Sequence, residues 1–447
     1  MSSEQLTIDN DQLPKGYKQT EVGLIPEDWE VCSVGHMGEV VTGKALAVNA
    51  PGQHRPYLRT KNVFDGRIDI DDVLTMPMTD AQFTHFMLMR GDVLLNEGQS
   101  LELVGRCAMY QDEYPEPCAM QNQLLRFRAR VDVSAAFASH LFRYCQQTGI
   151  FARIALQTTS VAHLGSKRFE RLLLPWPKSE AEQRSIAQAL SDVDRLIAAL
   201  ERAIAKKQAI KTATMQQLLT GKKRLPGFGE GKGYKETEVG IIPDDWILKP
   251  LEKVSAFITK GSTPTTYGFS WTQDGILFLR SECVSENGLD LSQSMFISEK
   301  AHSALSRSEL RSGDLLITIT GNVGRVVYLD EDFGVGNMNQ HIARVRINDN
   351  GVCSKFVYYY LNQTIVRRAF NAITTGQAYP QISLKQVRDA FVPMPLLEEQ
   401  RAIATVLSDM DAEIAALESR LTKTQSIKQG MMQQLLTGKV RLKLRQA

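Results

Sequence analysis

Asparagine, glutamine, arginine, lysine and glutamate side chains gather at a few places along this chain, most of them directly after a predicted β-strand. Arginine and lysine bind guanine or phosphate, asparagine and glutamine pair with adenine, and glutamate accepts a hydrogen bond from cytosine. In the first half the candidates are Arg59, Lys61, Asn62, Glu97, Gln99, Ser100, Gln121, Asn122, Gln123, Ser160, His163, Ser166, Lys167 and Arg168. In the second half they are Lys260, Arg280, Glu282, Asn322, Arg325, Asn339, Gln340, His341, Thr375, Gln377 and Tyr379. Each residue taken singly is more often a solvated loop residue, but recurrence at matching places in both halves predicts a surface that reads nucleic acid.

Motifs for catalysis or cofactor binding fit the sequence poorly. The stretch "GEVVTGKA" (Gly38–Ala45) nearly matches a phosphate-binding loop, but Ala45 lacks the hydroxyl that would hold Mg²⁺, and no strong helix follows. "GFGEG" (Gly227–Gly231) reads as a linker because no strand precedes it. The seven histidines lack metal-ligand spacing, and no hydrolase, metalloprotease or Asn-Pro-Pro-Tyr methyltransferase motif occurs. We therefore expect recognition without catalytic, cofactor-binding or metal-binding residues.

The chain is built from two copies of one layout. "GYKQTEVGLIPEDW" (Gly16–Trp29) returns as "GYKETEVGIIPDDW" (Gly233–Trp246), with 11 of 14 positions identical. "MQQLLTGK" at 215–222 returns at 432–439, and both repeats share one offset of 217 residues (16 to 233 and 215 to 432). The regions between the repeats, roughly 30–175 and 247–393, hardly match. A solenoid would repeat every ~20–50 residues, so this pattern indicates duplication of a whole domain with its spacer.

The second repeated motif predicts a long helix in each copy. Ser179 is a candidate N-cap with Glu182 three residues later, and Gly221 and Gly438 are candidate left-handed C-caps. Apolar residues recur in steps of four and three, which is the seam of a coiled coil. The seam residues are Ile186, Leu190, Val193, Ile197, Leu200 and Ile204 in the first copy, and Ile403, Leu407, Met410, Ile414, Leu417 and Leu421 in the second. Such a seam needs a partner, so we expect the two helices to pair antiparallel; the alternative is that each packs only on its own globular domain.

The variable regions alternate short strands and turns and close with helices. We expect an α/β (α+β) fold with two globular β-sheet domains, two long antiparallel helices and approximate internal twofold symmetry. The predicted boundaries are a polar tail at 1–15, a first domain at 16–178, a helical spacer at 179–221, a linker at 222–232, a second domain at 233–395 and a C-terminal helical region at 396–447. Within the second domain, "SKFVYYYLNQTIVRRAFN" (354–371) reads as helical.

Composition indicates a globular protein of several domains. The chain has 447 residues, of which 43% are hydrophobic and 23% charged, and a net charge of +2. A small nucleic-acid-binding protein is often far more basic, so this balance neither supports nor excludes DNA. The six cysteines are scattered without a C-x-x-C pair, which predicts reduced thiols in a cytoplasmic protein. No signal peptide or membrane-length apolar run is visible.

The paired motifs resemble those of the DNA specificity (S) subunits of type I restriction–modification systems, and the resemblance covers the chain beyond its polar tail. The stretches that carry it are "TEVGLIPEDWEV" and "TEVGIIPDDW", "EQRSIAQALSDVD" and "EQRAIATVLSDMD", and "MQQLLTGKKRL" and "MQQLLTGKVRL". The resemblance implies two target recognition domains, each reading half of a split DNA sequence, with helical regions that space the domains and dock modification subunits. Base-contacting residues vary widely in this family, so the candidate residues above rest on chemistry and position.

The same resemblance implies the partners and cofactors. The partners are double-stranded DNA with a bipartite site, two methyltransferase (M) subunits and restriction/translocase (R) subunits, with no membrane. No cofactor is expected in this chain, whereas S-adenosylmethionine is expected in the M subunit, and ATP and Mg²⁺ in the R subunit. One competing hypothesis is a stand-alone DNA methyltransferase or nuclease, which the missing catalytic motifs disfavour. Another is a coiled-coil scaffold without DNA binding, which leaves two large divergent domains unexplained.

Overall fold

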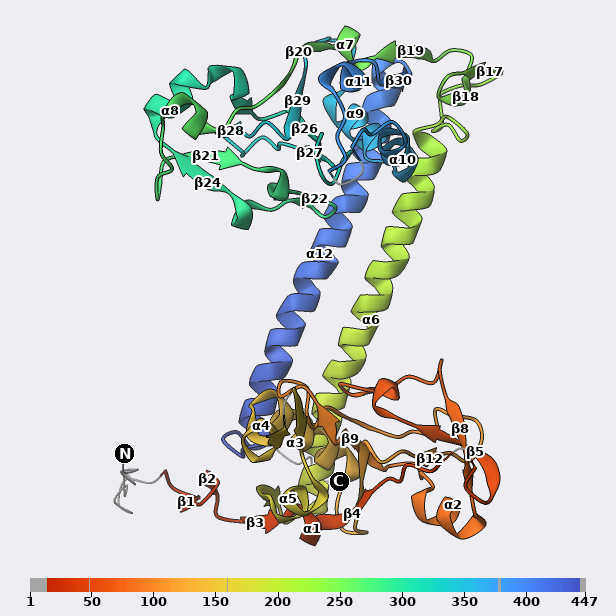
Figure 1. Cartoon of the computed structure of the whole chain (residues 1–447), viewed down its shortest axis with the longest axis vertical. Coiled ribbons are helices and arrows are strands. Elements are labelled where there is room, and N and C mark those ends of the chain that lie inside the picture. Colours follow the sequence, from red (N-terminus) through yellow and green to blue (C-terminus); the bar gives the residue numbers. More distant parts are fainter. Residues whose placement is uncertain (1–13, 48, 159, 377–378, 443–447) are drawn as a thin grey trace. The chain divides into compact units, whose positions relative to one another are not determined.

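The computed structural model describes residues 14–47, 49–158, 160–376 and 379–442. The chain forms two compact units, one from 1–201 with 419–447 and the other from 202–418. Helix α6 (Glu180–Leu218) begins in the first unit and ends in the second, and α12 (Leu397–Leu435) does the reverse (Figure 1). Each unit therefore contains part of each long helix. None of the helices in the described residues is long and apolar enough to cross a lipid bilayer.

The first unit is built on short, mostly antiparallel sheets covered by helices. Its central sheet has the order β11-β9-β13-β4, and a second sheet has the order β12-β5-β8, in which β12 and β5 run parallel. The strands are β1 (Tyr17–Thr20), β2 (Gly23–Pro26), β3 (Trp29–Ser33), β4 (Gly38–Thr42), β5 (Gln53–Leu58), β6 (Val63–Phe64), β7 (Arg67–Ile68), β8 (Leu74–Met78), β9 (Val93–Asn96), β10 (Gly98–Gln99), β11 (Cys107–Met109), β12 (Ala119–Met120), β13 (Leu124–Ala129), β14 (Leu156–Thr158), β15 (Val161–His163) and β16 (Leu173–Pro177). The shorter helices are α1 (Val34–Met37), α2 (Asp80–Phe86), α3 (Ala135–Gln147), α4 (Ile150–Ile154) and α5 (Ser166–Arg171).

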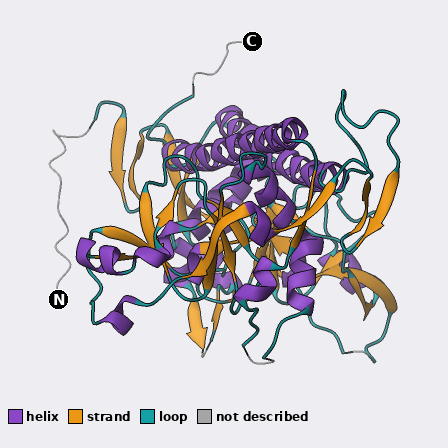
Figure 2. Ribbon diagram, turned by 90° about the horizontal axis from the view of Figure 1, so that it is seen from above, coloured by secondary structure: helices purple, strands orange, loops and turns teal. Residues whose placement is uncertain are grey.

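The second unit repeats this plan with different side chains. Its sheets have the orders β20-β29-β26-β27 and β24-β21-β28-β25, again with one parallel pair, β21 and β28. The strands are β17 (Tyr234–Thr237), β18 (Gly240–Pro243), β19 (Ile247–Pro250), β20 (Ser255–Lys260), β21 (Ile276–Leu279), β22 (Val284–Ser285), β23 (Gly288–Leu289), β24 (Met295–Ile297), β25 (Leu310–Arg311), β26 (Leu315–Thr318), β27 (Val326–Tyr328), β28 (Val335–Met338), β29 (Ile342–Ile347) and β30 (Phe391–Met394). The shorter helices are α7 (Leu251–Val254), α8 (Glu299–Ala304), α9 (Ser354–Leu361), α10 (Thr364–Ala372) and α11 (Leu384–Arg388). Figure 2 distinguishes the helices from the strands of both units. The α/β class predicted from the sequence is confirmed.

One predicted helix is two helices in the structure. The segment 354–371 divides into α9 and α10, and the break falls at Asn362 and Gln363. The backbone amides of both residues bond back to carbonyls of α9, to Tyr358 and Tyr360 respectively, so α9 closes with its own turn before α10 begins. A polar pair that can end one helix and start another is hard to distinguish from a solvated helical face by periodicity alone.

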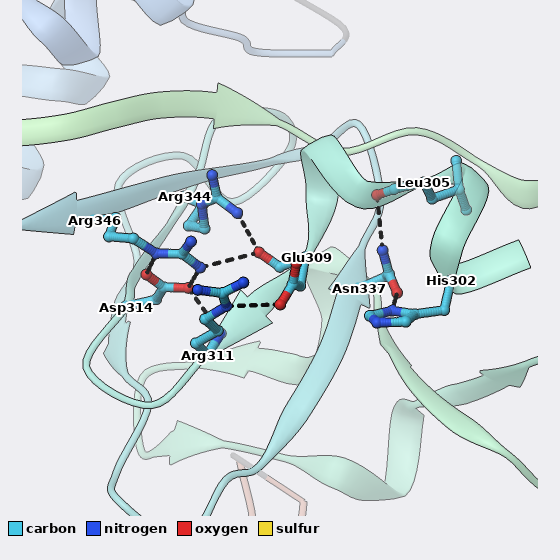
Figure 3. A network of polar contacts seen from close by, with 8 residues as sticks. All are labelled: His302, Leu305, Glu309, Arg311, Asp314, Asn337, Arg344 and Arg346. Carbon is cyan, nitrogen blue, oxygen red and sulfur yellow. Dashed lines mark hydrogen bonds and ion pairs between the residues drawn. The ribbon is translucent and has the colours of Figure 1, made fainter. Parts of the chain in front are cut away.

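A matched ion pair joins the central strands of each unit. In the first unit, Nε and Nη2 of Arg128 on β13 each donate to a carboxylate oxygen of Asp92 at 2.7 Å. In the second, Arg346 on β29 binds Asp314 with the same two distances of 2.7 Å (Figure 3). Each aspartate follows a glycine in a turn directly before a buried strand and is 1% exposed, so the pair holds this turn against the neighbouring strand.

The second unit adds polar contacts around this pair. Nε of Arg311 donates to the Glu309 carboxylate at 2.6 Å, and the guanidinium of Arg344 donates to the Glu309 carbonyl. Beside them the buried Asn337 amide donates to the Leu305 carbonyl at 3.0 Å and contacts the His302 ring at 2.6 Å. In Figure 3, Arg344 and Arg346 of β29 and Arg311 of β25 meet at Glu309, so these contacts join the two sheets of the second unit, while Asn337 of β28 is tied separately to His302 of α8 and to Leu305 directly after it.

The long helices run antiparallel within each unit. In the second unit Lys207 contacts Glu413 at 2.6 Å, and Lys211 pairs with Asp411. In the first unit Asp194 contacts Lys428 at 2.5 Å. Because partner numbers fall on one helix as they rise on the other, the direction is antiparallel. Lys211–Asp411 and Asp194–Lys428 are also the same pair related by the 217-residue offset.

Both packing modes considered from the sequence occur along the seam. All twelve seam residues are buried or partly buried. Ile186 and Leu190 join the core of the first unit, which also contains Leu435 and Leu436 of the C-terminal repeat, and Ile403 and Leu407 do the same in the second unit beside Leu218 and Leu219. The start of each helix therefore packs on its own domain and on the end of the other helix together.

Each hairpin repeat (16–29 and 233–246) contacts the octapeptide of the other copy and the arginine shortly after it. The Tyr17 hydroxyl donates to the Gly438 carbonyl at 3.1 Å, and Arg441 forms two bonds with Asp28 at 2.8 and 2.9 Å. In the second unit the Tyr234 hydroxyl donates to the Gly221 carbonyl at 3.2 Å, and Arg224 forms two bonds with Asp245 at 3.0 Å. The octapeptide is present twice because each unit needs one copy to anchor its own β-hairpin.

Candidate nucleic-acid interface

In the first unit the ends of several strands meet at one edge, where many predicted residues lie. The backbone N–H of Gln121 donates to the Leu58 carbonyl at 2.9 Å, which places the loop after β12 beside the end of β5. The Glu97 amide donates to the Gln123 carbonyl at 2.8 Å, which adds the end of β9. Gly43 packs against the same loop, since a Cβ atom there would lie 2.1 Å from the Gln121 carbonyl oxygen. The near match to a phosphate-binding loop is therefore a strand whose glycine permits close backbone contact.

The second unit builds the same backbone frame. The backbone N–H of Asn339 donates to the Leu279 carbonyl at 2.9 Å, as the backbone N–H of Gln121 does to the Leu58 carbonyl. The Gly261 amide donates to the Asn339 carbonyl at 3.2 Å, and a Cβ at Gly261 would lie 1.8 Å from the Met338 carbonyl oxygen. The equivalent main-chain bonds Gln121–Leu58 and Asn339–Leu279 thus hold loops with different side chains, Gln121, Asn122 and Gln123 in the first unit and Asn339, Gln340 and His341 in the second.

A polar cleft of about 570 Å³ opens at this edge of the second unit. Three predicted residues, Lys260, Gln340 and Thr375, line it. The cleft also contains polar residues that sequence reasoning missed, namely Thr320, Gln381, Ser383 and Gln386. Gln381 and Ser383 belong to the irregular segment before α11, Gln386 lies in α11, and Thr320 follows β26 and bridges to Gln381. The Ser383–Gln386 capping box was the available signal, but it indicates a helix start and says nothing about a cleft.

Gln340 is the best-positioned amide in this cleft. Its Oε1 accepts a hydrogen bond from the Thr263 hydroxyl at 2.7 Å, and its Nε2 lies 3.1 Å from Nε2 of His341. The His341 ring in turn meets the exposed ring of Tyr379 edge to face, with centroids 6.2 Å apart. Three predicted residues are therefore joined to a threonine that was not predicted.

In the first unit an acid–histidine pair occupies the corresponding edge. Oε2 of Glu97 lies 2.9 Å from Nδ1 of His163. Glu97 directly precedes β10 and His163 ends β15, and these two strands are paired. A Cβ at Gly98 would lie 2.6 Å from Oε1 of Gln123, so that glycine gives Gln123 room beside the pair. Arg168 donates to the His163 carbonyl at 2.7 Å and braces the strand from behind.

The cluster after β5 is held together by one aspartate. Arg59 and Lys61 contact the Asp72 carboxylate at 2.7 and 2.5 Å, and the Lys61 ammonium and Arg59 guanidinium hold the pKa of that carboxyl below its usual value. Asn62 is 2% exposed, accepts from the Arg59 amide and donates to the carbonyls of Asp69 and Asp72. Asn62 thus braces the loop that presents Arg59 and Lys61, and its predicted contact with DNA stays a prediction.

Several predicted residues of the second unit already have internal partners. Nε of Arg280 donates to the Gln293 carbonyl at 3.1 Å, Arg325 lies 3.8 Å from the Glu286 carboxylate, and Asn339 is 8% exposed and accepts from the His341 amide. Glu282 and Asn322 are exposed. Arg325 pairs with a residue of the β22–β23 turn and is not among the residues that line the cleft. Its role in DNA binding also stays a prediction.

The remaining predicted residues are exposed or partly exposed. They are Gln99, Ser100, Gln121, Asn122, Ser160, Ser166 and Lys167, while Gln377 lies outside the described residues. Within the described part of the chain, no group of three or more histidine, cysteine, aspartate or glutamate side chains is arranged to hold a metal ion.

Comparisons with known proteins place this geometry in a family. The family model described as "Type I restriction modification DNA specificity domain" matches the chain twice, at residues 26–212 and 243–429. Two relatives come from Methanocaldococcus jannaschii. The protein described as the MjaX specificity subunit of a type I restriction enzyme is 28% identical, covering 96% of this chain and 97% of its own. The type I restriction enzyme MjaVIII specificity subunit is 24% identical with the same two coverages.

Solved structures share the fold. The S subunit of a type I restriction–modification system from M. genitalium is 14% identical, with a TM-score of 0.56, covering 91% of this chain and 96% of that chain. A chain from a study of the assembly and conformational transition of a type I R-M system is 18% identical, with a TM-score of 0.57, covering 93% and 99%. At these identities the structural likeness shows a common fold.

Proposed function

Because the chain belongs to the family of type I restriction–modification specificity subunits, we propose that each of its two domains reads one half of a bipartite DNA site at the strand-end edge. The observation that carries the proposal is one backbone frame built twice with different polar side chains. The Gln121–Leu58 and Asn339–Leu279 bonds fix equivalent loops, while the side chains around them diverge. Two similar frames with different side chains suit the reading of two different sequences.

The domains supply the groups that DNA recognition requires. Lys260 ends β20 in the second unit and Lys44 lies two residues after β4 in the first, where a cation can contact phosphate, and amides such as Gln340 and Asn122 can contact base edges. The chain as a whole has a net charge of only +2, so DNA affinity that depends on phosphate contacts should be weak without a partner. We therefore assign a large share of the affinity to associated methyltransferase chains.

In the proposed complex, recognition and chemistry belong to different chains. This chain performs no chemistry of its own; two methyltransferase subunits dock on it and carry S-adenosylmethionine, and restriction subunits carry ATP and Mg²⁺. The long helices set the spacing between the two domains. This assignment rests on family membership together with the two strand-end edges described above.

Two experiments test this function. The purified chain is incubated with DNA and labelled S-adenosylmethionine, alone and with the methyltransferase chain of its own system. We expect methyl transfer only with the partner, and transfer by the lone chain would contradict the proposal. Methylome sequencing of a host that expresses both chains should then show one split motif, and methylation without a split motif would also contradict it.

A further inference from the structure

The Gln340 amide is fixed at both ends before any DNA arrives. Thr263 lies 2.7 Å from its oxygen and His341 lies 3.1 Å from its nitrogen, and all three side chains are partly buried. A primary amide has two acceptor lone pairs on oxygen and two N–H donors. Since each neighbour uses one of these groups, one acceptor and one donor stay free in a plane whose orientation is already set.

That remaining pair matches one base edge. Adenine presents its N6 donor and N7 acceptor side by side in the major groove, and a glutamine amide meets both at once. We propose that Gln340 reads an adenine in the half-site bound by the second unit, with Thr263 and His341 as positioning residues. The inference rests on the proposed function and identifies one base position of that half-site.

The other amides near the cleft are less suited to this role. Gln386 accepts from the Ser383 amide at 2.8 Å and donates to the Ile373 carbonyl at 3.0 Å, so it caps α11. Asn339 is 8% exposed and accepts from the His341 amide. Gln381 is exposed, and its bridges to Thr320 and Thr375 are made by its main chain, so they do not orient its side-chain amide. Among these four amides, only Gln340 lines the cleft with both of its ends held by side chains, which leaves it directed by the cleft rather than by a helix cap.

The test uses the chain assembled with its methyltransferase subunits. The complex selects duplexes from a library randomised at both half-sites, and the bound duplexes are sequenced. In Gln340→Glu the side chain loses its donor and accepts only, which suits the cytosine N4 amino group. We expect adenine to be replaced by cytosine at one position of one half-site, with a change in preference of roughly tenfold or more.

Matched variants separate reading from folding. Gln273→Glu makes the same chemical change on an exposed glutamine of the same unit that does not line the cleft, and it should leave all preferences unchanged. Thr263→Val removes the hydroxyl at nearly constant shape and should weaken the adenine preference several-fold without changing the base, whereas Thr263→Ser should restore it. If Gln340→Glu fails to fold, the two Thr263 variants decide.

Different outcomes would refute the role of Gln340, the role of Thr263 and the proposed function. A folded Gln340→Glu complex with unchanged preferences, or a loss of preference spread over many positions, would refute the role of Gln340. Equal selectivity of Thr263→Val and wild type would refute the positioning role. A wild-type complex that selects no split sequence would instead refute the proposed function itself.

Discussion

Arg224 is a sharp place to test how the repeated motifs hold the structure together. Its guanidinium lies 2.5 and 2.7 Å from the two oxygens of Glu399 and 3.0 Å from both oxygens of Asp245. It also lies over the ring of Trp246, 5.5 Å from the centroid. Burial alone lowers the pKa of Arg224, but its hydrogen bonds to Glu399 and Asp245 outweigh that effect and raise it.

The expected cost of Arg224→Met follows from what is left behind. The Glu399 side chain is 1% exposed, so removal of the arginine leaves a buried carboxylate without its ion-pair partner. Breaking a buried pair in this way typically costs about 3–5 kcal/mol. We expect the free energy of unfolding to fall by about 3 kcal/mol, and the double variant Arg224→Met/Glu399→Gln to recover most of it because no buried charge remains. Lys223→Met, an exposed neighbour that loses the same charge, should change stability by less than ~0.5 kcal/mol.

The offset-related residue Arg441 gives a second, weaker test. Its side chain is 38% exposed, and of its partners Glu182 is 6% and Asp28 63% exposed. Because Arg441 and Asp28 face solvent, we expect Arg441→Met to cost less than Arg224→Met, about 1–2 kcal/mol. Urea unfolding of the four single and double variants measures these differences.

Hydrogen exchange then shows which hairpin each arginine holds. Arg224→Met should speed amide exchange in 233–246 and leave 16–29 unchanged, and Arg441→Met should do the reverse. Exchange that rises in 16–29 upon Arg224→Met would mean that each hairpin uses the octapeptide that follows its own domain, and the exchanged pairing described above would be wrong.

Further predictions concern the caps, acid stability, half-site reading and domain spacing. Gly438→Ala should lower the thermal unfolding temperature by several degrees, because φ is +72° and the added Cβ would lie 2.4 Å from Cδ of Pro26. The Arg224 guanidinium holds the pKa of Asp245 below its usual 3.8, so this pair stabilises the fold fully above about pH 4 and loses its effect as pH falls through the lowered pKa. Acid titrations of wild type and Arg224→Met should therefore converge at low pH. Alanine at Arg59 and Asn122 should impair reading of one half-site only, and alanine at Arg280 and Gln340 the other, as library selection would show. Four residues inserted after Leu200 lengthen α6 by ~6 Å, so the preferred gap should grow by one or two base pairs at ~3.4 Å each; an unchanged gap in an active variant would refute spacing by the helices.

The sequence predicts the helices well because their determinants are local. Ser179 caps α6 as expected, with the Glu182 amide 3.4 Å from its hydroxyl, and Gly221 and Gly438 adopt φ of +68° and +72°. The heptad steps correctly identify the buried face of both helices. They could not show that Ile186 and Leu190 also enter a domain core, because an apolar seam has the same spacing whichever surface covers it.

The pairing of the repeats could not be read from the sequence for a different reason. The octapeptides at 215–222 and 432–439 are identical. Both therefore offer a hairpin the same glycine carbonyl, which can accept a hydrogen bond from the tyrosine hydroxyl, and the same arginine shortly afterwards. Local chemistry cannot choose between identical partners. The choice is made by helix direction: an antiparallel pair brings the end of α12 to the start of α6, which places Arg441 beside Glu182 as well as Asp28. Glu182 and Glu399 are themselves related by the 217-residue offset, so the second acid is the same in both units and helix direction alone decides the pairing.

The candidate site was predictable in residue type and only partly in arrangement. Lys260, Gln340 and Thr375 were chosen for their chemistry at strand ends, and the structure brings them to one cleft. Thr263, which fixes the Gln340 amide, is 77 residues away in sequence and belongs to no motif, so nothing local marks it. Asn62 and Asn339 show the converse, since the amide chemistry that could read adenine also satisfies backbone groups in a tight loop. Burial decides between these two uses of the same side chain, and burial is a property of the assembled fold. An amide met by main-chain groups in a tight loop is a brace, whereas the Gln340 amide, met by side chains at a cleft, keeps the donor and acceptor that the proposed base contact needs.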